Sequence, residues 1–154
     1  MRRDIVLFLG ALAVIGGGAA ALFTFTGRDG QDPTYEPTPF AVCLGTIPAL
    51  NAEPLTEIVF KAADSDLAKV VTSAEGGDVD GAQAAFVGPH ALTHNVDGPL
   101  RQADKPLAIR LCNEVVIMER ELVSGRDPAV IAERARKIRD GLAGAAVALG
   151  MEPQ

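Results

Sequence analysis

Apolar residues recur every three or four positions through most of the chain after residue 50, which is the spacing of one face of an α-helix. The first such stretch covers about residues 53–74, and two glycines end it. A second helix is expected to begin after Asp78, to kink or break at Gly88-Pro89 and to close at residues 97–99. The inward face of the first helix is predicted to consist of Leu55, Ile58, Val59, Ala62, Leu67, Val70, Val71 and Ala74.

Two further helices follow the same spacing. Asp104 is expected to cap the third helix, and Gly125 is expected to end it in the left-handed conformation. Asp127-Pro128 is a preferred helix start and begins the fourth. Because the connections are short, residues 51–150 are predicted to form an all-α, antiparallel up-down four-helix bundle, followed by a tail at 151–154. The inward stripe of the fourth helix is predicted to be Ile131, Ala135, Ile138, Leu142, Ala145 and Leu149.

The N-terminus has a different pattern. Residues 5–25 are 21 consecutive positions without a charge, which is long enough to cross the hydrocarbon core of a membrane. Arg2 and Arg3 precede this run and favour a cytoplasmic N-terminus. We therefore expect residues 1–26 to be an uncleaved transmembrane signal-anchor in a bacterial inner membrane, with the remaining chain on the periplasmic side. A signal peptide cleaved near Ala19–Ala21 is the alternative.

Small residues line this predicted membrane helix in pairs. Gly16 and Ala20 are four residues apart, as are Gly17 and Ala21, and such pairs let a second transmembrane helix approach closely. The pattern favours other integral membrane proteins as partners, although glycine and alanine are also common in export signals.

Prolines and glycines interrupt residues 27–50, so we expect a linker without a regular helix. The linker contains Cys43, and the only other cysteine, Cys112, falls in the third predicted helix. Two cysteines in an exported chain favour a disulfide, which would pin the linker onto the bundle. The alternative is two free thiols, with Cys112 buried.

Charge narrows the class of partner. The chain has 14 basic and 20 acidic residues, and its net charge is −6 with histidine neutral. An acidic chain is repelled by the phosphate backbone, so the charge argues against nucleic acid as a partner.

His90 and His94 are the only histidines and lie four residues apart, so on a helix their rings would share one face. Asp97 lies one turn further, and Glu114 on the next helix is a candidate fourth ligand. Two imidazoles with carboxylates suit a divalent transition metal such as zinc or copper. The ordinary alternative is that both histidines are exposed or cap the bundle.

Three features of residues 77–150 occur together: the run Asp80–Phe86, the run Val96–Arg101, and Gly125 before an alanine-rich last helix. In these features the stretch resembles the extracytoplasmic helical domain of bacterial high-affinity iron permeases. His94 stands where that family usually has an acidic residue, and the membrane-embedded acidic motifs of the permeases are absent. The resemblance implies a related helical fold on a separate anchor, near metal or redox chemistry, and not an iron channel.

Catalytic motifs do not stand out in this sequence. No serine lies at a recognisable spacing from a base, and Met118 is expected to fill core volume rather than to bind haem. We therefore expect no enzyme. The leading prediction is an accessory or structural subunit of a membrane protein complex. The alternative is a periplasmic binding protein that handles iron or copper.

Overall fold

The computed structural model describes residues 40–50 and 54–151. Among these residues, no helix is both long enough and apolar enough to span a membrane. The predicted signal-anchor lies outside the described residues, and so do its small residues Gly16, Gly17, Ala20 and Ala21.

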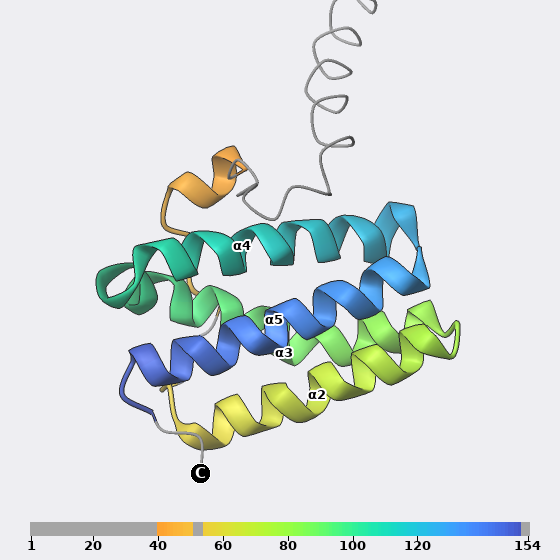
Figure 1. The fold of residues 1–154 in the computed structure, drawn as a ribbon, viewed down its shortest axis with the longest axis horizontal. Helices are drawn as coiled ribbons and strands as arrows, with labels where there is room; N and C mark the ends of the chain where they lie inside the picture. Colours follow the sequence, from red (N-terminus) through yellow and green to blue (C-terminus); the bar gives the residue numbers. More distant parts are fainter. Residues whose placement is uncertain (1–39, 51–53, 152–154) are drawn as a thin grey trace, which may run out of the picture. The chain divides into compact units, whose positions relative to one another are not determined.

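Every regular element in the described part of the chain is helical, which confirms the predicted all-α class (Figure 1). Two elements are short: η1 is a 3₁₀ turn at Ala41–Leu44, and η2 is a π-helical turn at Glu121–Gly125 that continues α4 directly. The four long helices are α2 (Glu57–Glu75), α3 (Val79–Ala103), α4 (Lys105–Arg120) and α5 (Pro128–Ala148).

Aspartate side chains cap three of these helices, as predicted. Each carboxylate accepts a hydrogen bond from a first-turn amide, which otherwise has no partner within the helix. The bonds run to Asp78 from Gly81 at 2.8 Å, to Asp104 from Leu107 at 2.9 Å and to Asp127 from Ala129 at 2.9 Å.

The four helices pack in a ring around one core. Helix α2 contacts α3 and α5, and α4 contacts the same two helices. Short turns join successive helices, which lie side by side in Figure 1, so the structure is a four-helix bundle. All four helices contribute to the core, whose largest fully buried side chains include Leu67, Leu100, Met118, Ile131 and Ile138.

Helix α3 is longer than predicted, because it continues through Pro89 and Pro99 for 25 residues. Each proline lacks an amide hydrogen and removes one bond from the helical ladder. Core residues flank both prolines: Phe86 and Leu92 are buried around Pro89, and Val96 and Leu100 are buried around Pro99. We infer that packing against the other helices outweighs the missing bonds. The predicted end at residues 97–99 is therefore wrong.

Helix α2 also differs from the prediction, in its start and in its face. It begins at Glu57 rather than near residue 53, and Ile58, which was expected to point inward, is 79% exposed. Ile58 precedes the buried Phe60 by two positions, a rotation of about 200° around the helix axis. The buried stripe is Phe60, Ala63, Leu67, Val70 and Ala74.

The end of α4 is shifted by one residue from the prediction. Arg126, with φ of 53°, is the left-handed residue in place of Gly125. The π-helical turn η2 takes one more residue than an α-helical turn, so the left-handed position falls one residue later.

Residues 40–50, which we call the strap, are attached to α3 and α4. Cys43 of the strap and Cys112 of α4 form the predicted disulfide, with an S–S distance of 2.02 Å. Cys43 is the only strap residue that is buried. This part of the predicted linker is therefore held against the bundle by its covalent bond and by the backbone contacts described below.

Candidate metal centre

His90 and His94 lie one turn apart on α3. Their Nε2 atoms are 3.2 Å apart, and their ring centroids are 4.7 Å apart with the rings nearly perpendicular. Residues four apart on an α-helix share a face, so the continuity of α3 beyond Pro89 brings the two rings together. The prediction that both histidines share one helical face is confirmed.

Glu119 of α4 joins the two histidines. Its Oε1 atom lies 2.6 Å from His90 Nε2. One ligand atom from each of His90, His94 and Glu119 lies within 4.8 Å of the other two. Two neighbouring helices therefore present two imidazole nitrogens and one carboxylate oxygen to the same small volume.

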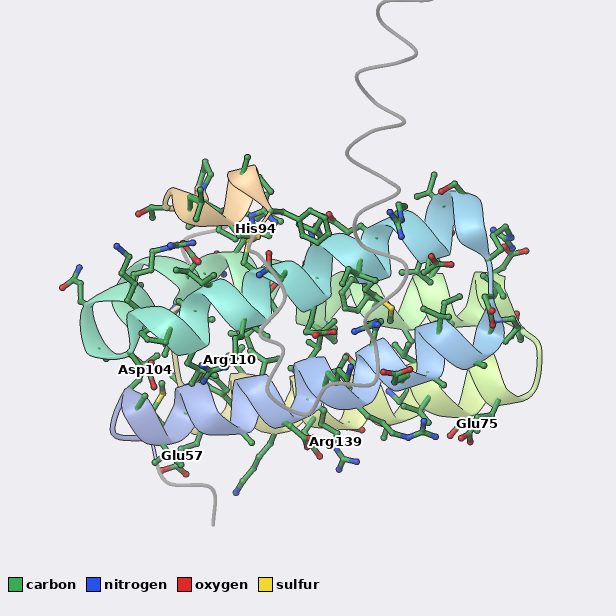
Figure 2. All side chains as sticks on the ribbon, turned by 45° about the horizontal axis from the view of Figure 1, so that its top comes forward. Glu57, Glu75, His94, Asp104, Arg110 and Arg139 are labelled. Atoms are coloured by element: carbon green, nitrogen blue, oxygen red, sulfur yellow. A yellow bond between two sulfur atoms is a disulfide. The ribbon has the colours of Figure 1, made fainter. Side chains whose placement is uncertain are left out.

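The strap determines which nitrogen of His94 carries a proton. Nδ1 of His94 is 2.9 Å from the carbonyl oxygen of Pro48, and Figure 2 shows His94 beside the strap. A carbonyl oxygen only accepts hydrogen bonds, so Nδ1 is the donor and carries the proton. In the neutral ring the lone pair then lies on Nε2, the atom that faces His90.

The cluster is partly open to solvent. The side chain of His90 is 29% exposed and that of Glu119 is 45% exposed. On the core side, the Phe86 ring centroid lies 5.7 Å from that of His90. Three protein ligands at an open site leave at least one coordination position for water or for another ligand.

Asp97, which the sequence predicted as a ligand, is engaged elsewhere. Its carboxylate is buried and accepts hydrogen bonds from Arg101 Nε at 2.7 Å and from the Ile47 amide at 2.9 Å. Arg101 also donates to the carbonyl oxygen of Cys43 at 2.9 Å. Asp97 therefore ties the strap to α3 and is absent from the three-residue cluster.

Glu114, the other predicted carboxylate ligand, faces α5. It accepts a hydrogen bond from Arg134 at 2.8 Å, and both side chains are largely buried. Glu114 and Glu119 are five residues apart, which places them about 140° apart around α4. The structure thus puts Glu119, and not Glu114, beside the histidines.

The antiparallel pairing of α3 and α4 identifies Glu119 as the residue beside the histidines. Asp104 is the only residue between the two helices. His90 precedes it by 14 residues and Glu119 follows it by 15, so an antiparallel pair places them at the same level. The register could not be predicted from the sequence, because the second helix was expected to end at residues 97–99 and not next to Asp104.

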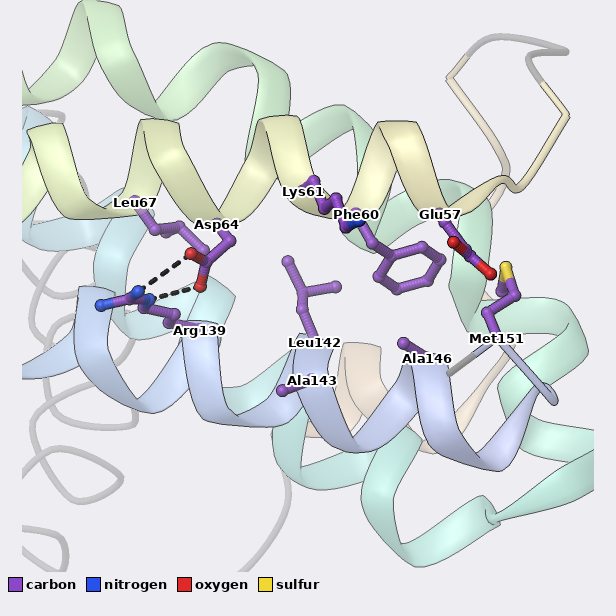
Figure 3. Close-up of a pocket in the computed structure, with 10 residues that line it drawn as sticks. All are labelled: Glu57, Phe60, Lys61, Asp64, Leu67, Arg139, Leu142, Ala143, Ala146 and Met151. Atoms are coloured by element: carbon purple, nitrogen blue, oxygen red, sulfur yellow. Dashed lines mark hydrogen bonds and ion pairs between the residues drawn. The ribbon is translucent and has the colours of Figure 1, made fainter. Parts of the chain in front are cut away.

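A second concave feature is a groove of about 430 Å³ between α2 and α5 (Figure 3). Two acids and two bases line it, so its charge favours neither an anionic nor a cationic ligand. Its apolar lining is Phe60, Leu67, Leu142, Ala143, Ala146 and Met151, and its charged lining is Glu57, Lys61, Asp64 and Arg139.

An ion pair joins α2 to α5 across this groove. Arg139 donates two hydrogen bonds to the carboxylate of Asp64, one of them from Nη2 to Oδ2 at 2.9 Å. The hydrogen bond from Arg139 lowers the pKa of the Asp64 carboxyl below its ordinary value. The same pair raises the pKa of Arg139, so both groups are charged at neutral pH.

Compared with models of protein families, with curated protein sequences and with solved structures, the chain matches none. The resemblance to the helical domain of iron permeases stays a prediction.

Proposed function

We propose that this protein handles a divalent transition-metal ion, which it binds through His90, His94 and Glu119. The observation that carries the proposal is the convergence of three ligand atoms, from two helices, within 4.8 Å. Imidazole and carboxylate are common ligands of transition metals, and the two helices supply them from a rigid frame.

The distances suit a small cation. Two nitrogens bound at about 2.1 Å to one tetrahedral ion lie about 3.4 Å apart, and the Nε2 atoms of His90 and His94 are already 3.2 Å apart. The 2.6 Å contact between His90 and Glu119 must lengthen by several tenths of an ångström, which the exposed Glu119 side chain allows. The ligand set favours Zn²⁺ or Cu²⁺, and the open position also suits Fe²⁺.

The proposed location is the periplasmic side of a bacterial inner membrane. The arginines before the apolar run at residues 5–25 support this orientation. The disulfide between Cys43 and Cys112 supports an oxidising compartment, because such bonds are rare in the cytosol. An open metal site at this location fits a protein that takes up an ion and passes it to a membrane-bound partner.

Metal titration of the full-length protein in detergent tests the proposal. After chelator treatment, the protein should bind one Zn²⁺ per chain in isothermal titration calorimetry. His94→Ala and Glu119→Gln should each weaken binding by at least about tenfold, because the first removes a direct ligand and the second removes the negative charge of another. Glu114→Gln is the matched control on the same helix and should leave the affinity unchanged, since Glu114 pairs with Arg134.

Two outcomes would contradict the metal proposal. The first is an unmodified protein that binds no Zn²⁺, Cu²⁺ or Fe²⁺ in the titration. The second is binding that His94→Ala leaves unchanged, which would place the ion at another site.

The second candidate function is an accessory subunit of a membrane complex, and the surface of the strap supports it. Val42, Leu44 and Leu50 are each more than half exposed. Apolar side chains gathered on one exposed segment can mark a contact with another protein. If the strap binds a subunit, replacing these three residues by Ser should release partners that co-purify in mild detergent. Partners that still co-purify with the variant would count against this second function. The absence of any co-purifying partner with the unmodified protein would also count against it.

A further inference from the structure

We propose that the strap controls metal affinity at the His90–His94–Glu119 site. Pro48 is the positioning residue, because its carbonyl oxygen orients the ring of His94. The disulfide between Cys43 and Cys112 keeps that carbonyl in place. This inference rests on the proposed function, since it concerns the affinity of the same site.

The strap orients the ring of His94 before any ion is bound. The hydrogen bond from Nδ1 to Pro48 holds the proton on Nδ1 and leaves the Nε2 lone pair toward His90. Histidine ligands of metals commonly donate their other ring N–H to a carbonyl or carboxylate, which fixes both the tautomer and the ring plane. Pro48 supplies that acceptor before any ion is bound.

Hydrogen bonds hold the strap on both sides of Pro48. On one side, the Ile47 amide donates to Asp97 Oδ2 at 2.9 Å. On the other side, the Leu50 amide donates to Asn95 Oδ1 at 3.1 Å. Both acceptors lie on α3 within three residues of His94, so the carbonyl is held next to the ring that it orients.

The disulfide is the covalent attachment of the strap to the bundle. Among the strap side chains only Cys43 is fully buried, and only Phe40 and Ile47 are partly buried, so limited apolar burial holds the segment. The backbone attachments of the strap are hydrogen bonds, which water can replace when the strap lifts. The disulfide keeps the strap close enough for these bonds to form again. Without it, we expect the strap to detach and His94 to sample both tautomers and other ring orientations.

The closing experiment compares the full-length protein with Cys43→Ala/Cys112→Ala in detergent. Loss of an orienting partner typically weakens metal binding by about 10-fold to 100-fold, and we expect a loss of this size for Zn²⁺. Nitrogen-15 NMR of the metal-free proteins gives an independent readout. His94 should show a single Nδ1–H tautomer in the unmodified protein and a tautomer mixture in the double variant.

Two further variants separate positioning from general destabilisation. Leu67→Ala removes a buried side chain of α2 and leaves the strap intact, so its Zn²⁺ affinity should equal that of the unmodified protein. Ile47→Pro keeps the disulfide but deletes the amide hydrogen that Asp97 accepts, so it should weaken Zn²⁺ binding. If circular dichroism shows that the double cysteine variant does not fold, the Zn²⁺ affinity of Ile47→Pro tests the inference instead.

The outcomes distinguish this inference from the proposed function. Equal Zn²⁺ affinity in the unmodified protein and the strap variants would overturn the inference and leave the metal site standing. The same His94 tautomer signals in both would also overturn it. Absence of Zn²⁺ binding by the unmodified protein, while His94 still shows one tautomer, would overturn the proposed function and with it the claim about affinity.

Discussion

Two arginine–aspartate ion pairs have the same N–O distance but differ in their exposure to solvent. Arg101 and Asp97 are 2.7 Å apart and almost fully buried, whereas Arg126 and Asp80 are also 2.7 Å apart but exposed. A buried charge that loses its partner keeps the cost of its desolvation, while an exposed charge is compensated by water. Equal distances therefore imply unequal consequences of mutation.

Replacing Arg101 by Met should lower the free energy of unfolding by about 3 kcal/mol or more, because Asp97 would stay buried without its cation. The matched substitution Arg126→Met should cost less than about 1 kcal/mol. Urea denaturation followed by circular dichroism measures both values. Similar losses for the two variants would contradict the different roles of the pairs.

The pair between Asp64 and Arg139 gives a prediction about pH. Because the folded state lowers the pKa of Asp64, its charge stabilises the fold above the ordinary carboxyl pKa, and this contribution is lost as the pH falls through the lowered value. The side chain is about half exposed, so Asp64→Asn should cost about 0.5 kcal/mol at pH 7. The difference from the unmodified protein should begin to shrink below about pH 4 and vanish at lower pH. A difference independent of pH would contradict this account.

At the scale of the elements, the sequence predicted the starts of α3, α4 and α5 but neither the start of α2 nor the end of α3. Asp104 and Asp127 act within one turn, so their neighbours in sequence suffice to identify them as caps. The continuation of α3 past Pro99 depends on side chains of other helices that bury Val96 and Leu100. That contribution is absent from any local stretch of sequence, which explains the wrong end at residues 97–99.

Two glycines at helix ends should respond differently to alanine. Gly77 has φ of +79°, so Gly77→Ala should cost about 1 kcal/mol of stability through backbone strain alone. Gly125 has no such conformation, and a methyl group there meets only the flexible end of the Glu121 side chain. Gly125→Ala should therefore change the free energy of unfolding by less than about 0.5 kcal/mol. Thermal unfolding compares the two, and equal losses would contradict the shifted end of α4.

At the scale of the whole molecule, the disulfide closes a loop between residues 69 positions apart. In the chain-entropy model such a link is worth about 4 kcal/mol. Cys43→Ala/Cys112→Ala should lower the midpoint of urea unfolding accordingly while keeping the helical circular dichroism spectrum, because the one buried strap side chain, Cys43, lies outside the main hydrophobic cluster of the four helices. An unchanged midpoint would show that the strap contributes nothing to stability.

The candidate site was partly predictable for a related reason. His90 and His94 share one helix, so their spacing alone placed them together. The carboxylate comes from another helix, and its identity depends on the register of α3 against α4, which a wrong helix end obscured. Asp97 matched the spacing but pairs with Arg101 four residues later on the same helix, a pairing that the wrong helix end at residues 97–99 excluded.

Anomalous X-ray diffraction from zinc-loaded crystals would show whether one metal ion binds between α3 and α4. We expect one zinc peak at about 2.1 Å from Nε2 of both His90 and His94 and at a similar distance from a carboxylate oxygen of Glu119. A zinc peak at other residues, or no peak near these three, would contradict the metal proposal.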